Sequence, residues 1–194
     1  MSGSVELSAS TPQVANWSAS AEPGAVPGRA CGTCKLCCKV AAVEEFAKPM
    51  AVWCPHCQRG NGCAIYMSRP PSCRSFYCQW MLVPGLGDEW KPERAKFALV
   101  RTEGGHRLTA LVDPGYPVAW RRSPYFENLK HWAAQAAQKW PELHLVDVMI
   151  GTHCIVLLPD REVDMGTLAA GEMIQLTARM VGPSRVFDAC KVKG

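Results

Sequence analysis

The second half of the chain alternates apolar and polar residues over short runs, as half-buried β-strands do. The connections between these runs are short, and two of them, T-E-G-G-H and V-G-P-S, contain the residues of tight turns. The runs predict strands in successive pairs: 96–101 with 107–113, 144–150 with 154–158, and 173–180 with 185–191. We therefore expect a small antiparallel sheet.

A helical pattern lies between the first two strand pairs. Ser123 and Pro124 are typical of an N-cap and a first-turn proline, and Pro141 stops a helix that we expect to end near Lys139. A sheet with at least one covering helix gives residues 81–194 an α+β arrangement. The apolar stripe of the predicted helix, expected in the core, consists of Phe126, Leu129, Trp132, Ala133, Ala136 and Trp140.

The first eighty residues show no such sustained period. Residues 1–29 are rich in Ser, Ala, Pro and Gly, which predicts a disordered leader. Residues 30–80 contain little apolar material for a core of their own, so we expect a bound metal to supply folding energy there. The chain is thus predicted to contain a small cysteine-rich metal-binding module, packed as one unit on an antiparallel β-sheet with one or more covering helices.

Cysteine is the unusual part of the composition. The chain has 194 residues, 48% of them hydrophobic, and nine of its 11 cysteines lie between Cys31 and Cys78. Such a density is typical of disulfide scaffolds and of metal or iron–sulfur modules. The first 30 residues have no basic residue before Arg29 and no apolar run of a secretory signal, and no membrane-length apolar run occurs, so we expect a cytoplasmic protein. Reduced thiols there act as ligands or redox groups.

The first cysteine cluster is C-x2-C-x2-C-C, formed by Cys31, Cys34, Cys37 and Cys38. A C-x2-C turn brings two thiolates to one ion, and two successive steps are similar to the run that binds a cubane iron–sulfur cluster. Adjacent side chains diverge, so one of the last two cysteines is expected to face a second site or to stay free.

The second cluster consists of Cys54, Cys57, Cys63, Cys73 and Cys78. The pattern C-x2-C-x16-C-x2-C, drawn from Cys34 to Cys57, fits a tetrahedral zinc site. Nine thiols exceed the need of one such site, which leaves two hypotheses: two metal sites, or one cluster with spare cysteines. His56, between two of the cysteines, is expected to stay outside the ligand set.

A rival interpretation starts from Trp53-Cys54-Pro-His-Cys57, which looks like a thiol–disulfide oxidoreductase motif. That chemistry needs the first cysteine at the start of a helix. Two glycines within a few residues of Cys57 make a helix unfavourable there. We therefore rank the oxidoreductase below the metal site.

Charge supports the metal hypothesis. Residues 31–78 carry six basic and two acidic side chains, a net of +4 that equals the formal charge of the whole chain. Metal-bound thiolates would be anionic, and nearby cations would compensate them; nucleic acid is the less favoured partner. The candidate compensating residues are Lys35, Lys39, Arg59, Arg69 and Arg74.

Other residues receive structural interpretations. Cys154 and Cys190 lie in apolar, strand-like runs and are expected to pack in the core as small hydrophobes, although His153 next to Cys154 would make a tempting metal pair. Arg74 is interpreted mainly as a structural arginine. The sequence contains no G-x-S-x-G, no phosphate-binding glycine loop and no H-E-x-x-H, so no catalytic residue is predicted.

Together, C-x2-C-x2-C-C and the later C-x-I-Y-x2-R-P-x2-C-R-x-F, from Cys63 to Phe76, resemble the YkgJ-like cysteine-cluster family, the CxxCxxCC zinc- or iron-chelating domain. The resemblance covers roughly residues 31–78, and Cys57 and Cys78 lie outside its minimal pattern. A larger relative, the flagellin lysine N-methylase, shares the cysteine motif and is associated with an iron–sulfur cluster. The resemblance thus implies zinc or iron; no S-adenosylmethionine loop accompanies it, so methylase activity is not implied.

The sequence therefore predicts a metal-binding protein that chelates zinc or iron, the iron alone or in a 4Fe–4S cluster, with no membrane partner. Two alternatives stay open: a redox enzyme or electron carrier that uses the cluster or the Cys54/Cys57 dithiol, and an interaction module with structural zinc. The predicted ligands are Cys31, Cys34, Cys37, Cys38, Cys54, Cys57, Cys63, Cys73 and Cys78.

Overall fold

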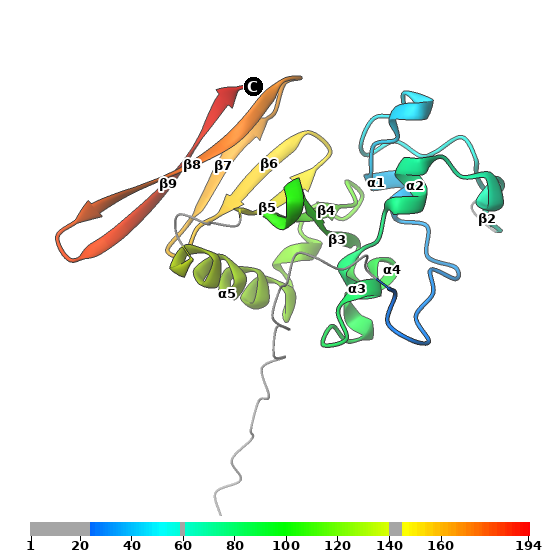
Figure 1. Ribbon diagram of the computed structural model, residues 1–194, viewed down its shortest axis with the longest axis horizontal. Helices are drawn as coiled ribbons and strands as arrows, with labels where there is room; N and C mark the ends of the chain where they lie inside the picture. Colours follow the sequence, from blue (N-terminus) through cyan, green and yellow to red (C-terminus); the bar gives the residue numbers. More distant parts are fainter. Residues whose placement is uncertain (1–23, 59–60, 140–144) are drawn as a thin grey trace, which may run out of the picture.

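The computed structural model of the protein describes residues 24–58, 61–139 and 145–194 (Figure 1). Most of the predicted leader, together with Arg59 and Trp140, lies outside these ranges. Within them, five strands form one sheet in the order β3-β4-β5-β6-β7. Its strands are β3 (Phe97–Thr102), β4 (Arg107–Val112), β5 (Leu145–Ile150), β6 (His153–Leu157) and β7 (Glu162–Thr167).

The sheet is mixed, so the prediction of a purely antiparallel sheet is wrong. β3 pairs with β4, and β5 with β6, as antiparallel hairpins, which confirms two of the predicted pairs. β4 and β5 are parallel neighbours, with Arg107 opposite Leu145. The helix α5 (Tyr125–Gln138) connects them, and such a crossover returns the chain to the same end of the sheet, so the next strand runs in the same direction.

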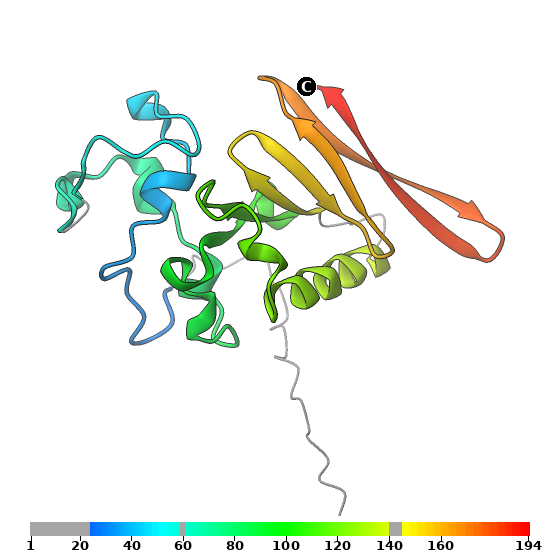
Figure 2. The same cartoon turned by 180° about the vertical axis from the view of Figure 1, so that it is seen from behind.

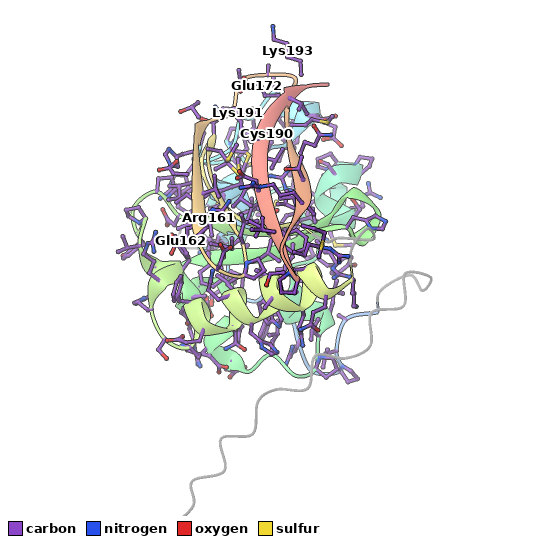
Figure 3. All side chains as sticks on the ribbon, turned by 90° about the vertical axis from the view of Figure 1, so that its left-hand side faces the viewer. Arg161, Glu162, Glu172, Cys190, Lys191 and Lys193 are labelled. Atoms are coloured by element: carbon purple, nitrogen blue, oxygen red, sulfur yellow. The ribbon has the colours of Figure 1, made fainter. Side chains whose placement is uncertain are left out.

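The third predicted pair is confirmed as a long hairpin of β8 (Glu172–Val181) and β9 (Ser184–Lys193). It forms a separate two-stranded sheet at the end of the molecule away from the cysteine module of residues 31–78 (Figures 1 and 2). β9 lies beside β7, where Arg161 donates to the carbonyl of Phe187 at 2.9 Å and Lys191 to that of Thr167 at 2.6 Å (Figure 3). β7, with its glycine and two acidic residues, lacked a strand signal in the sequence.

Cys190 does not pack in the core as predicted. Successive residues of a strand point to opposite faces. On β9 the side chain of Phe187 is buried and faces the core cluster, whereas Cys190 is on the opposite face, exposed (Figure 3). The prediction for Cys154 is confirmed, because its side chain is fully buried on β6. The His153 ring instead contacts the carboxylate of Asp164, with 2.9 Å between Nε2 and Oδ1.

Helix α5 covers one face of the sheet (Figure 1). Of the predicted stripe, it buries Leu129, Trp132, Ala133 and Ala136, and Phe126 is partly buried. Its aromatic neighbours meet edge to face: Tyr125 packs against Trp90 and Phe97 with both centroid separations at 5.0 Å. The predicted Ser123 cap is wrong, since the helix begins after Pro124 without a side-chain cap bond. No helix in the described residues has the length and apolar content to cross a membrane.

The cysteine module contains only short elements, as its sequence predicts. They are joined by turns and lie together at one end of the molecule (Figures 1 and 2). They are α1 (Cys37–Val40), the 3-10 helix η1 (Glu44–Phe46), β1 (Cys57–Gln58), β2 (Gly62–Cys63), η2 (Tyr66–Ser68), α2 (Pro71–Ser75) and α3 (Gln79–Leu82). η3 (Asp88–Trp90) and α4 (Pro92–Ala95) then lead into β3, and η4 (Glu103–Gly105) and η5 (Ala119–Arg121) belong to the sheet region.

The module shares its core with the sheet. Leu36, Val40, Trp80 and Met81 are buried in the same hydrophobic cluster as Phe97 and its neighbours on β3. Polar bonds add to this contact: the Arg29 guanidinium donates to four carbonyls between Trp80 and Leu86, and Lys39 forms an ion pair with Asp113 after β4. The elements that carry the thiols are therefore anchored to the sheet through this shared core.

A buried ion pair joins β4 to β5. The Arg107 guanidinium donates to the fully buried carboxylate of Asp147 at 3.2 and 2.5 Å. The same carboxylate accepts from Thr109 Oγ1 at 2.7 Å and from Cys154 Sγ at 3.5 Å. Burial, followed by the charge of Asp147, raises the pKa of Cys154 to about 12. This thiol therefore stays protonated, in agreement with a packing role.

Arg107→Met should destabilise the fold by about 3–5 kcal/mol, because it leaves the carboxylate of Asp147 buried without its cation. The matched control is Arg121→Met, whose guanidinium is also bidentate to a carboxylate, that of Glu162, but at a side chain 44% exposed. That change should cost less than about 1 kcal/mol. Urea unfolding of both variants measures the difference; equal losses would contradict the assignment.

Candidate metal centre

The cysteines of the module surround one cavity. Its volume is about 130 Å³, enough for several water-sized atoms. Among the residues of its wall are apolar side chains from well-separated parts of the chain, such as Phe46, Ile65, Phe76 and Met81. Eight cysteines also line it: Cys31, Cys34, Cys37, Cys38, Cys54, Cys63, Cys73 and Cys78. Eight of the nine predicted ligands are therefore brought together, and Cys57 is the one described cysteine of the segment outside this wall.

Two of these thiols accept hydrogen bonds from backbone N–H groups. Cys34 accepts from the N–H groups of Leu36 and Glu93, and Cys78 accepts from those of Trp80 and Met81. Burial raises the pKa of Cys78 to about 11 and also raises that of Cys34, while these hydrogen bonds act in the opposite direction. N–H donors directed at sulfur stabilise a thiolate and tune a bound metal.

Cys37 and Cys38 have opposite electrostatic environments, although they are adjacent on α1. Their thiols hydrogen-bond to each other, and this contact, with burial, raises the pKa of Cys37 strongly. The pKa of Cys38 is lowered to about 6, first by that hydrogen bond and then by one from Cys57, with the cations of Lys48 and Arg69 adding to the effect. Burial raises the pKa of Cys57 to about 11, so Cys57 is the protonated donor to a Cys38 thiolate.

Lys48 is the cation that the sequence interpretation missed. Its side chain is buried, and its ammonium donates to the carbonyls of Lys39, Ala41 and Pro49, at 3.3 Å to the first and 3.0 Å to the last. Burial lowers its pKa, while the charges of Cys54, Cys38, Cys37 and Cys73 oppose that shift. A lysine among apolar neighbours in the sequence gives no signal that separates a buried from an exposed position, so only the fold identifies it.

Of the basic residues predicted to compensate the thiolates, two act on cysteine pKa values and two instead bind other groups of the protein. Arg69 lies over the Tyr66 ring at 3.8 Å and is close enough to lower the pKa of Cys38. Lys35 acts in the same direction on Cys57. Lys39 instead pairs with Asp113, and Arg74 donates through Nε to the carbonyl of Arg69 at 2.6 Å. Arg74 thus makes a contact within its own segment, of the kind that its structural interpretation expects.

The segment before Cys73 is held by a carboxylate. Glu45 of η1 accepts from the backbone N–H of Ser72 at 3.1 Å and from its hydroxyl at 2.6 Å. The backbone is extended at Pro70, and a helical turn begins at Pro71 and contains Cys73. This contact fixes η1 and α2 on neighbouring sides of the cavity.

The W-C-x-x-C segment does not have the geometry of a thiol–disulfide oxidoreductase. Residues 54–58 form a turn, in which the Cys57 N–H donates to the Cys54 carbonyl at 3.0 Å, and then strand β1. Cys57 lies opposite Cys63 in the β1–β2 pair. Cys54 therefore lacks the helix start that activates such a thiol. The ring of His56 packs against Phe46 at a centroid distance of 4.8 Å.

All eleven cysteines, which lie in the described part of the chain, are free thiols. Among the described residues, no group of three or more Cys, His, Asp or Glu side chains is arranged so that it could hold a metal ion. Structural metal sites rarely exist preformed in the absence of their ion, since binding and local folding occur together.

In the metal-free protein, Cys38 should be alkylated by iodoacetamide with a midpoint near pH 6, because the thiolate is the nucleophile and its pKa is about 6. The rate should rise through that pH and level off above it. Cys57→Ala removes a hydrogen-bond donor to the thiolate and should move the midpoint upward, whereas Cys190→Ala should not move it. Peptide mass spectrometry over a pH series measures this; a wild-type midpoint near 9.0, the ordinary thiol value, would contradict it.

Comparisons of the chain with protein-family models, with curated proteins and with solved structures gave no match. What the cavity binds must therefore follow from the chemistry of its wall. Clustered thiols with N–H donors and nearby cations favour a thiophilic metal such as zinc or iron over a hard cation, which prefers oxygen ligands.

Proposed function

We propose that the protein binds zinc or iron through the clustered cysteines of residues 31–78. One observation carries this proposal: eight cysteines, spread over 48 residues of sequence, line a single cavity. A core position does not require so many thiols, and a disulfide scaffold would pair them, whereas all are free. The resemblance of the two cysteine motifs to the YkgJ-like family supports the same chemistry.

The electrostatics of the cavity also support thiolate ligands. A metal ligand must be deprotonated, so a site is favoured where hydrogen bonds and cations stabilise the anion. Cys38 has this environment from Cys57, Lys48 and Arg69. Cys34 and Cys78 are more deeply buried, and their N–H donors would stabilise the thiolates once an ion replaces their protons.

Both metals are compatible with such a donor set. Zinc forms closed tetrahedral sites with four cysteines, and iron binds the same residues either alone or in a 4Fe–4S cluster. A purely structural zinc belongs to the same proposal, because the module has few apolar residues and a metal would supply part of its folding energy. The redox alternative through Cys54 and Cys57 has no comparable support, since Cys54 is followed by a turn and a strand.

The full-length protein, purified without oxygen, should contain zinc or iron at one or more equivalents per chain, measured by elemental analysis together with acid-labile sulfide. Broad visible absorption with sulfide would identify an iron–sulfur cluster, and a colourless protein with zinc would exclude the electron carrier. The reason is the donor set of the cavity: free, clustered thiolates retain a soft metal through purification.

Cys34→Ser should lose metal and lower the thermal stability of the module, because it removes a thiol that two N–H groups hold in the cavity wall. Cys190→Ser is the matched control: it removes an exposed thiol on β9 at the far end of the molecule and should leave the metal content unchanged (Figure 3). A wild-type chain free of metal, even after anaerobic incubation with zinc and with iron plus sulfide, would disprove the proposed function.

A further inference from the structure

We infer that the eight thiols of the cavity form two separate tetrathiolate sites, each for one divalent ion. The first site consists of Cys31, Cys34, Cys37 and Cys78, and the second of Cys38, Cys54, Cys63 and Cys73. This inference rests on the proposed function and specifies it, because it assigns each cysteine of the cavity wall to one ion.

The first site is defined by mutual interactions among its members. Cys78 interacts electrostatically with Cys31 and Cys34, and Cys37 interacts with the same two thiols. The turn at the start of the module supports this grouping, since the Cys34 N–H donates to the Cys31 carbonyl at 2.9 Å. The N–H donors to sulfur described above, two on Cys34 and two on Cys78, also lie in this group.

The second group lies around Lys48. Cys73 interacts electrostatically with Cys38 and Cys54, and Lys48 interacts with all three. The backbone brings two of them together, because the Cys54 N–H donates to the Cys38 carbonyl at 2.8 Å. The bonds between Glu45 and Ser72 then hold Cys73 beside them.

The adjacent pair on α1 marks the boundary between the two groups. Consecutive residues of a helix leave its axis about 100° apart, so the Cys37 and Cys38 side chains reach their mutual thiol hydrogen bond from different directions. Both thiols interact with Lys48, but Cys37 also interacts with Cys31 and Cys34, whereas Cys38 interacts with Arg69 and Cys57. The doubled cysteine of C-x2-C-x2-C-C thus supplies one ligand to each site.

The fourth ligand of the second site is Cys63 rather than Cys57. These two residues are directly opposite each other in the β1–β2 pair. Cys63 lines the cavity with the other three thiols, whereas Cys57 is outside the wall and hydrogen-bonds the Cys38 thiol. Cys57 is therefore placed to donate to a ligand sulfur, the usual role of a group that orients a ligand without touching the metal.

The charge of the segment matches two ions. A divalent ion with four thiolates carries a net charge of −2, so two such sites carry −4. The other ionisable side chains of residues 31–78, six basic and two acidic, carry a net of +4. Counted over residues 31–78 alone, two tetrathiolate sites would balance the formal charge, whereas a single site would leave an excess of positive charge. One of these cations, Lys39, is also paired with Asp113 outside the segment.

Native mass spectrometry of the full chain, loaded with Zn²⁺ without oxygen, counts the ions directly. The wild type should bind two zinc ions, and Cys78→Ser and Cys73→Ser should each bind one. Cys190→Ser is the control and should bind two. Cys57→Ser tests the choice of Cys63 as the fourth ligand and should also bind two, because the serine hydroxyl can still donate to the Cys38 sulfur. One zinc in the wild type, loss of both ions in each single ligand variant, or a zinc lost from Cys57→Ser would overturn the assignment.

Alkylation of the zinc-loaded variants identifies which thiols hold the remaining ion. In Cys78→Ser, the remaining zinc should protect Cys38, Cys54, Cys63 and Cys73, while Cys31, Cys34 and Cys37 react; in Cys73→Ser the pattern should reverse. A mixed pattern would overturn the partition. A single iron–sulfur cluster per chain would overturn the two-site inference and leave the proposed function intact, whereas a chain that binds no metal at all would overturn both.

Discussion

The contact between the cysteine module and strand β3 is the interaction on which the arrangement of the thiols depends. The residues next to the cysteines in the sequence make this contact: Leu36 precedes Cys37, and Trp80 and Met81 follow Cys78. Burial of such side chains contributes about 1.5–3 kcal/mol each, far more than the short turns of the module could supply. The sheet therefore determines where α1 and α3 lie, and the thiols follow.

Electrostatics set a second constraint. Thiolates in a confined space repel one another, and a fixed cation reduces that repulsion. Lys48 is such a cation inside the module, where three backbone carbonyls hold its ammonium in place. Because these carbonyls accept all three of its protons, the ammonium has no capacity left for hydrogen bonds to sulfur and acts on the thiols by charge alone.

The sequence predicted what depends on local pattern. The helix over Leu129 and Trp132 and the three hairpins followed from spacing and turn residues, and the cysteine motifs indicated which thiols would meet. The parallel pairing of β4 with β5 was missed because strand direction depends on the crossover, which no single strand encodes. Cys190 was misplaced because apolar neighbours do not reveal which face of a ribbon is covered. Lys48 was missed for a similar reason: its burial depends on tertiary contacts.

The two ends of the module lie next to each other. Cys78 interacts with Cys31, the Val26 N–H donates to the Met81 carbonyl at 2.8 Å, and Arg29 reaches the carbonyls from Trp80 to Leu86. The module is therefore one continuous loop-like segment whose first and last residues lie side by side against the rest of the protein. Insertions in its outer turns can therefore lengthen this segment without shifting the strands of the sheet, as in other compact domains that tolerate insertions where two chain ends lie close together.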